Sequence, residues 1–327
     1  MIKNFLIGLV KALLALGLLF WLYQKGVLDF KILSKLFNPL LISAALLNLI
    51  ISFYFASWRW QILLVVQKIR LPRWDCYKLN LIGLFFNYVM PGGVGGDVVK
   101  AFYLVKDHPR NRMGAGMSVL LDRVMGLYAM LLLAITSLSF HYSSVIDNPQ
   151  LKFIFQSMII AFIGFTFGLA LALSDQFRQA GWKKYIEHSK IGKKLISAYE
   201  AVHSYSKHRK ILVRSVILSL ITQIFAILLM AWLGYQLGFT ETTLGTYFSV
   251  VPLGFMVTAI PISPAGVGVG QMAFFYLFNL FMGHESQVGP TVMTAYQVLN
   301  FILGLVGVWF FIQRKSSLKE VEGSLGS

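Results

Sequence analysis

The chain has 327 residues, of which 57% are hydrophobic and 13% charged, and its mean hydropathy is +0.69. Soluble domains average about 45–50% apolar and about 25% charged residues, so this composition excludes a water-soluble globular protein. The formal charge of +16 would indicate a nucleic-acid partner in a soluble chain. Here the basic residues lie between long apolar runs, so we expect anionic lipid, and no nucleic acid, as their partner. The single cysteine, Cys76, cannot form an intrachain disulfide.

Apolar stretches long enough to cross a membrane as helices, about 20 residues each, occur along most of the chain. We predict six full spans, at 5–23, 38–58, 118–140, 153–173, 211–236 and 291–312. The first stretch has no small-residue cleavage site after it, so we expect a span rather than a cleaved signal peptide. The sequence therefore predicts an all-α polytopic membrane protein.

Two further apolar segments, 79–105 and 247–282, are interrupted near their middles by clusters of proline and glycine, at 91–96 and 261–270. The arms on either side of each cluster are shorter than a membrane-spanning helix. This pattern predicts two re-entrant helical hairpins, each made of two half-helices that meet within the membrane. Unwound backbone at that depth must be buried in protein or line a wet cavity.

The distribution of lysine and arginine predicts the orientation of the spans. With the N-terminus inside, 25 of the 29 basic residues lie in cytoplasmic segments and four lie in outer loops. This count requires 79–112 to enter and leave from the cytoplasm and 247–290 to enter and leave from outside. We expect a multi-pass protein of the cell (inner) membrane with both termini in the cytoplasm.

The two interrupted segments occupy matching places in two units of similar length, 38–140 and 211–312. The first unit starts outside and the second inside, so we predict two inverted repeats within one integral membrane domain, 1–327. Matching interrupted segments in inverted halves are typical of a transporter with a substrate site near the midplane. A coincidence of two glycine-rich kinks is the alternative.

The tip of the first hairpin carries glycines followed by an acid and a base: Gly93, Gly95, Gly96, Asp97 and Lys100. We expect the second half-helix to begin at about Gly96–Asp97, where free N–H groups and the helix dipole favour an anion. Asp97 could instead serve as the N-cap. Lys100 lies one turn further on and could contact a phosphate or pair with Asp97.

Ionisable residues within spans are candidates for function because their burial in lipid is costly. Asp122 and Arg123 lie in span 118–140, and adjacent helix positions point about 100° apart, so they do not simply neutralise each other. Arg123 suits a phosphate because its guanidinium can contact two oxygens; the alternative is snorkelling to the interface. For Arg59 and Trp60, at the inner end of span 38–58, the sequence favours an interface anchor.

The second hairpin tip has the same glycine-rich character without an acid. Gly266 and Gly268 can bring backbone close to a ligand, and Gln271 can cap the next half-helix or contact a head group. Packing alone is an equally economical explanation of this tip. Gln223, Gln297 and other polar residues of the spans are expected to form interhelical hydrogen bonds.

The segment 174–214 resembles a soluble stretch and is rich in lysine and arginine. Apolar residues recur in it at helical spacings, which predicts a basic interfacial cytoplasmic segment at 174–210 made of one or two amphipathic helices. A plain connecting elbow is the alternative. The pair Gly164 and Gly168 has the spacing of a tightly packed helix contact.

The sequence contains no arrangement that we recognise as a catalytic, metal or cofactor site. The six histidines lie in loops or near span ends, and neither a zinc-type histidine motif nor a nucleotide-binding loop is present. We therefore expect no catalytic residue, no metal and no cofactor, and a protein that is not an enzyme.

Four motifs in this order resemble the lysylphosphatidylglycerol synthase transmembrane-region family, which includes flippase-type integral membrane proteins. They are Arg59-Trp60, the run from Pro91 to Lys100, Asp122-Arg123, and the run from Pro261 to Gly268. Many members have a glutamate where this sequence has Gln271. The chain also ends near residue 327, which leaves no room for an aminoacyl-transferase domain, so the resemblance implies translocation of lipid rather than its synthesis.

We therefore predict a flippase or transporter for a phosphate-containing lipid, with a head group that the sequence does not select: phospholipid, aminoacyl-phospholipid or polyprenyl phosphate. The alternative is a membrane-embedded enzyme or accessory subunit that acts on a lipid phosphate. The sequence leaves open whether the protein forms a homo-oligomer. The expected substrate-binding residues are Arg123, Asp122, Lys100, Asp97, Gly93, Gly95, Gly96, Arg59, Gly266, Gly268 and Gln271.

Overall fold

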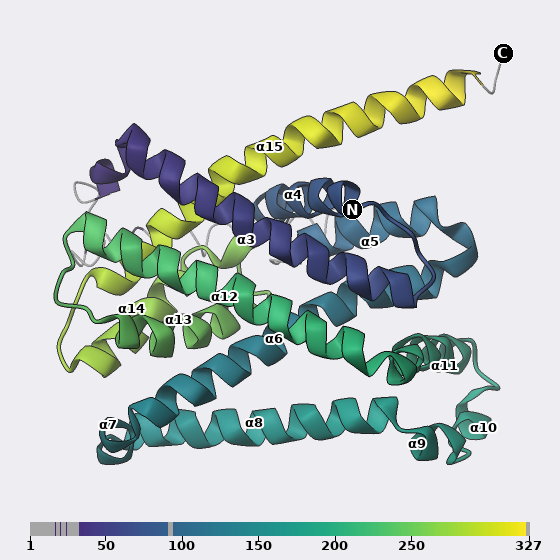
Figure 1. The fold of residues 1–327 in the computed structure, drawn as a ribbon, viewed down its shortest axis with the longest axis horizontal. Helices are drawn as coiled ribbons and strands as arrows, with labels where there is room; N and C mark the ends of the chain where they lie inside the picture. Colours follow the sequence, from purple (N-terminus) through teal and green to yellow (C-terminus); the bar gives the residue numbers. More distant parts are fainter. Residues whose placement is uncertain (1–16, 18–19, 21–23, 25–32, 91–93, 325–327) are drawn as a thin grey trace.

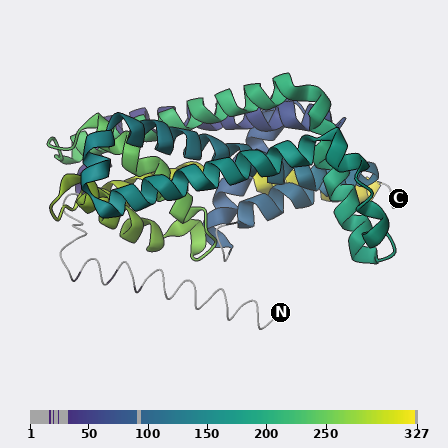
Figure 2. The same cartoon turned by 90° about the horizontal axis from the view of Figure 1, so that it is seen from below.

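The computed structural model describes residues 33–90 and 94–324, together with the single positions 17, 20 and 24. The expected first span, 5–23, therefore lies almost entirely outside the described residues. Every regular element between Lys35 and Ser324 is helical, which confirms the all-α class. Figure 1 shows long helices packed alongside one another, and Figure 2 shows that most of them run along the same general axis.

The helices that build the body of the molecule are α3 (Pro39–Val66), α4 (Arg73–Val89), α5 (Gly95–Asp107), α6 (Arg112–Phe140), α7 (Tyr142–Asp147), α8 (Pro149–Leu173), α12 (Arg209–Leu237), α13 (Leu244–Thr258), α14 (Val269–Met282) and α15 (Val288–Ser324). Between α8 and α12 lie α9 (Asp175–Gln179), α10 (Lys183–Ile186) and α11 (Lys190–His203).

Six helical segments of the described chain are long and apolar enough to cross a membrane: Pro39–Val66, Pro109–Phe140, Pro149–Leu173, Lys190–Leu237, Pro264–Met282 and Val288–Arg314. Five of them cover the spans predicted after the first one, except that the first of the five begins at Pro39 and not at residue 38. The sixth reaches its length only because the 3₁₀ turn Pro264–Gly266 is counted with α14. With 14 residues, α14 itself is about 21 Å long, which is shorter than the hydrocarbon core of about 30 Å.

Capping side chains and prolines explain where several long helices begin. The side chains of Asn38 and Asn148 accept hydrogen bonds from backbone N–H groups at the starts of α3 and α8, and a proline stands directly after each asparagine. Proline is well suited to the first helical position because the N–H group it lacks would have no partner there. Asn111 caps α6 in the same way, so that helix begins six residues before the predicted boundary at 118.

Each interrupted segment forms a pair of half-length helices. The first pair, α4 and α5, has 17 and 13 residues, and the second, α13 and α14, has 15 and 14. Within each pair the two helices pack against each other. The turn 91–93 lies outside the described residues. In the second turn, Gly266 and Gly268 have φ of +72° and +79°, a region that is readily open only to glycine.

The open ends of the two pairs lie at opposite ends of the bundle. Where α5 ends, Asp107 pairs with Arg314 near the C-terminal end of the apolar part of α15. The second pair opens at the other end, where Gly245 lies against His141, the C-cap residue directly after α6. Because α6 begins next to α5 and ends next to α13, the two hairpins approach each other from opposite directions.

The packing contacts of the two predicted repeats correspond to one another. Helix α4 packs on α5 and α15, and its counterpart α13 packs on α14 and α6. Helix α5 packs on α6 as α14 packs on α15. At the centre, α3 packs along its own counterpart, α12, and Figure 1 shows these two helices side by side.

Helix α8 lies at the edge of this body, next to α6, and α9–α11 gather beyond its C-terminal end (Figure 1). No residue in the most apolar part of α8 is buried within the protein. The expectation that Gly164 and Gly168 make a tight helix contact is wrong among the described residues, because a Cβ atom at either position would meet none of their atoms within 4 Å.

Candidate functional site

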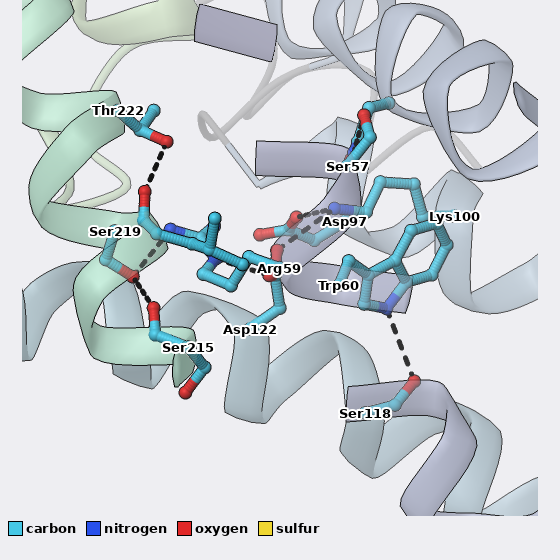
Figure 3. Close-up of polar contacts among 12 residues, drawn as sticks. Ser57, Arg59, Trp60, Asp97, Lys100, Ser118, Asp122, Ser215, Ser219 and Thr222 are labelled. Atoms are coloured by element: carbon cyan, nitrogen blue, oxygen red, sulfur yellow. Dashed lines mark hydrogen bonds and ion pairs between the residues drawn. The ribbon is translucent and has the colours of Figure 1, made fainter. Parts of the chain in front are cut away.

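A cavity of about 400 Å³ lies where the two hairpins, α3, α6 and α12 meet. Its lining includes the charged residues Arg59, Asp97, Lys100, Asp122 and Arg123. These come from three segments far apart in sequence: α3, the start of α5, and α6. Figure 3 shows the side chains of Arg59, Asp97, Lys100 and Asp122 converging on one region.

Asp122 and Arg59 form a buried ion pair across α6 and α3. The Nε atom of Arg59 lies 2.7 Å from Oδ1 of Asp122, and the side chains are 10% and 8% exposed. Nη1 of Arg59 donates to the hydroxyl of Ser219 on α12 at 3.0 Å. A charged group removed from water needs such partners, since an unpaired one is strongly destabilising. This pair therefore ties α3, α6 and α12 together.

Lys100 lies between the two acids of the cavity. Its Nζ atom is 3.6 Å from Asp97 and 3.7 Å from Asp122, and it lies 4.7 Å from the ring centre of Trp60. An ammonium over an indole face is attracted by the ring quadrupole. The indole of Trp60 donates in turn to Ser118 (Figure 3). Lys100 is thus held by two carboxylates and an aromatic face, and little of it is exposed.

Arg123 connects the two hairpins. Its Nη1 atom lies 2.6 Å from Oδ2 of Asp97 on the first hairpin, and Nη2 donates to the carbonyl of Ala259 at the tip of the second, at 3.2 Å. The side chain is 28% exposed. The alternative considered from the sequence, that Arg123 snorkels to the membrane interface, is wrong, because this guanidinium points into the protein. Its adjacent residue, Asp122, pairs elsewhere, as the separation of neighbouring helix positions predicted.

The close approach of α4 and α5 depends on two glycines. A Cβ atom on Gly96 would lie 2.1 Å from the carbonyl oxygen of Gly83, and a Cβ atom on Gly83 would lie 3.0 Å from the side chain of Lys100. The backbone N–H of Gly96 donates to the side chain of Asn87 at 2.8 Å. Asn87 therefore satisfies one of the N–H groups that the sequence left free for an anion.

The start of α5 corrects two expectations. The helix begins at Gly95, one residue earlier than expected, and its N-cap position is Val94. Asp97 therefore lies inside the first turn, so the interpretation of Asp97 as the N-cap is wrong. Its carboxylate points instead to Arg123 and Lys100.

Arg59 and Trp60 correct a third expectation. Helix α3 continues to Val66, eight residues beyond the predicted end of the span, so the two residues lie within the helix. They are 8% and 0% exposed. An interface anchor must reach the lipid head groups, so the interpretation of these residues as an anchor is wrong, and Arg59 belongs to the cavity.

The second hairpin tip is held by neutral hydrogen bonds. Gln271 accepts from the N–H of Gly268 at 2.8 Å and donates to Gln297 at 2.7 Å, and it is 1% exposed. Gln297 donates to the carbonyl of Ala265 at 3.1 Å and accepts at its own carbonyl from Tyr88 of the first hairpin at 2.9 Å. The expected capping role of Gln271 is confirmed.

The structure thus brings Arg123, Asp122, Lys100, Asp97, Gly96 and Arg59 to one cavity. Gly95, Gly266, Gly268 and Gln271 support the hairpins and do not line it. Gly93 lies outside the described residues. Of the polar span residues, Gln223, Gln297 and Asn300 do line the cavity.

Sequence reasoning missed Ser219, Gly83 and the capping role of Asn87. Ser219 could have been found from the sequence, because it is a serine within an apolar span and such side chains often form hydrogen bonds between helices. Gly83 is a single glycine in the first arm, and its importance follows only from the partner glycine that packs against it. The carbonyl of Ala259 carries no side-chain signal at all.

The charges that line the cavity do not cancel. The described lining contains three cations, Arg59, Lys100 and Arg123, and two anions, Asp97 and Asp122, which leaves one excess positive charge. No group of three or more metal-ligating side chains occurs among the described residues. By its composition, its helices and this internal charged cavity, the molecule is a multi-pass helical membrane protein.

Comparison with known proteins gives the family. The family model described as "Lysylphosphatidylglycerol synthase TM region" matches residues 8–307. The chain belongs to this family, as the four motifs indicated. No curated protein and no solved structure gives a match. Family membership associates the chain with a membrane lipid-related function.

Proposed function

We propose that this protein is a lipid flippase, which moves a phosphate-containing lipid across the membrane without changing it chemically. The observation that carries the proposal is the cavity at the meeting point of the hairpins, whose described lining has one excess positive charge. A lipid phosphate at that depth has lost its water and needs a compensating cation, because an unpaired charge there is costly. Its acyl chains stay in the bilayer.

The arrangement of the two hairpins supports transport. Each is made of helices too short to cross a bilayer, and their open ends face opposite ends of the bundle. The corresponding packing of α3–α6 and α12–α15 is what an inverted repeat requires. We propose that the hairpins are re-entrant and that the cavity opens to each side in turn as one repeat moves against the other.

Arg123 is the proposed phosphate ligand. In the structure its guanidinium binds Asp97 and the carbonyl of Ala259, so both partners are oxygen atoms that a phosphate can replace. A guanidinium makes two parallel hydrogen bonds to such a group. Binding of the phosphate would release Arg123 from Asp97, and Lys100 is close enough to keep Asp97 neutralised, at 3.6 Å. The exchange would loosen the contact between the hairpins.

The orientation and location are proposed together. The excess of basic residues outside the cavity in 59–78, 100–112 and 178–214 supports a cytoplasmic location for these segments, where anionic lipids would attract them. The membrane would be the cell (inner) membrane, with both termini inside. The basic segment 174–210, which contains α9–α11, would lie on the inner surface.

A transport assay tests the function. In proteoliposomes with a fluorescent phospholipid in one leaflet, the wild-type protein should move the lipid and Arg123→Gln should abolish movement. Arg123→Lys keeps the charge but loses the second hydrogen bond, so we expect at least about a tenfold slower rate. Arg70→Gln, which changes an exposed arginine outside the cavity, should transport normally. Full transport by Arg123→Gln would refute the proposed site.

Labelling of introduced cysteines tests the orientation. Tyr142 and Lys190 are exposed, at opposite ends of the proposed bundle, and the native Cys76 is buried. A Tyr142→Cys variant should react with an impermeant thiol reagent added outside intact cells. A Lys190→Cys variant should react only after permeabilisation. The reverse pattern would show that the protein has the opposite orientation. Labelling of both variants from outside would refute the proposal that the two residues lie on opposite sides of the membrane.

A further inference from the structure

A second, separate hollow lies on the surface of the helix bundle, away from its central cavity. It is an apolar groove of about 500 Å³ between α3, α4 and α15, and no residue that lines it also lines the charged cavity. Tyr54, Trp74 and Val306 line it and are 40%, 56% and 43% exposed. Two of the three helices, α3 and α15, contain candidate membrane spans, so this groove opens toward lipid.

One end of the groove carries an uncompensated positive charge. Arg73, the first residue of α4, donates to the hydroxyl of Tyr54 at 2.6 Å and to the side-chain oxygen of Gln61 at 3.1 Å. Its guanidinium also lies 4.7 Å from the ring centre of Trp58. All these partners are neutral, and within the described chain no carboxylate forms an ion pair with Arg73.

Among the described charged side chains that contact residues lining the groove, Arg73 is the one left without a carboxylate. Lys78 pairs with Asp75 at 3.4 Å, and its ammonium lies 5.7 Å from the ring centre of Trp74, which lines the groove. This pair is neutral as a unit. A ligand that complements the whole feature must therefore have a single negative charge at one end and an apolar chain behind it.

We propose that the groove binds one anionic phospholipid, with its phosphate at Arg73 and an acyl chain between α3 and α15. An acyl chain has apolar surroundings in the bilayer as well as in the groove, so its binding in the groove is favoured only by close packing. Selectivity among lipids must therefore come from the charge of the head group. In the proposed orientation Arg73 faces the cytoplasmic leaflet, where anionic lipids are enriched. The bound lipid would join the first hairpin to α3 and α15 and would not be the lipid that is transported.

Native mass spectrometry of the purified full-length protein with added phosphatidylglycerol tests the charge contact. The wild-type protein should retain one more tightly bound phosphatidylglycerol than Arg73→Gln, whose affinity at that site should fall about tenfold, the loss of one charge-assisted hydrogen bond. Arg70→Gln removes an exposed charge three residues away and should retain the lipid. Equal losses in the two variants would show general attraction to basic residues and overturn the proposal.

A second pair of variants tests the groove itself. Val306 lines the groove and Val298 does not, yet both lie on α15 and are 43% and 42% exposed. Val306→Trp should fill the groove and lose the same single lipid, whereas Val298→Trp should keep it. Retention of the lipid by Val306→Trp, or equal binding of zwitterionic phosphatidylethanolamine by the wild-type protein, would refute the site. Both results are independent of whether the central cavity transports anything.

Discussion

The two hairpins share a geometry but differ in how they are held. The first, α4–α5, contributes Asp97 and Lys100, which join an ion-pair network with α3 and α6. The second, α13–α14, is fixed by neutral hydrogen bonds through Gln271 and Gln297. Arg123 touches both, binding a carboxylate on one side and a carbonyl on the other.

This difference indicates a division of roles. Charges held by other charges can exchange partners when an anion arrives, whereas a neutral network of amides with all its bonds made is rigid and specifies one arrangement. We infer that the first hairpin provides the binding chemistry and the second provides a fixed surface against which it moves. The predictions below test that contrast, beginning with the largest expected effect.

Breaking the network of the first hairpin should cost more stability than breaking that of the second. Asp122→Asn leaves Arg59 and Lys100 without a shared carboxylate in a buried position, and we expect the free energy of unfolding to fall by about 3 kcal/mol. Gln271→Leu removes neutral hydrogen bonds and should lower it by about 1–2 kcal/mol. Unfolding in mixed micelles measures both. A larger loss for Gln271→Leu would contradict the contrast.

The close contact inside the first hairpin can be tested by adding a single methyl group. Gly96→Ala places a Cβ atom 2.1 Å from the carbonyl oxygen of Gly83, so the helices must separate, and we expect a loss of about 2 kcal/mol. Gly164→Ala on α8 adds the same group where no atom of the described part of the chain lies within 4 Å. That variant should be neutral or more stable by up to about 1 kcal/mol, from helix propensity alone. Thermal unfolding in detergent compares the pair.

Removing the carboxylate that competes for Arg123 should strengthen the binding of an anionic phospholipid and slow its transport. Asp97→Asn raises the excess charge of the described cavity lining and frees Arg123 for phosphate. We expect affinity for an anionic phospholipid to rise about tenfold, or about 1.4 kcal/mol, with slower release and a lower transport rate. Binding in detergent and transport in proteoliposomes give the two readouts. Weaker binding by Asp97→Asn would show that Asp97 contacts the substrate favourably instead of competing with it.

Composition and apolar length were enough to predict the all-helical membrane class and the helices α3, α6, α8, α12 and α15. Proline and glycine clusters located both pairs of half-length helices, because several such residues in succession end a helix, whereas a single proline such as Pro252 is accommodated inside α13. These signals are local, so they can be read from the sequence. Whether the pairs are re-entrant stays a prediction.

The partners within the site were harder to predict because they depend on tertiary contacts. Asp122 and Arg123 were found as charges inside a span, but their partners, Arg59 and Asp97, are 63 and 26 residues away. Arg59 was among the expected substrate-binding residues, but an interface anchor was favoured for it because α3 was expected to end before it. The polar residues that follow the apolar stretch gave no sign that other helices would cover them.

The position of a bound phosphate tests the central claim most directly. A structure of the protein in nanodiscs containing phosphatidylglycerol should show, in the central cavity, phosphate density within about 3 Å of the Arg123 guanidinium, the usual length of a charge-assisted hydrogen bond. The 2.6 Å contact between Arg123 and Asp97 should be broken. A cavity without phosphate and with that contact intact at saturating lipid, or a phosphate bound there away from Arg123, would contradict the account.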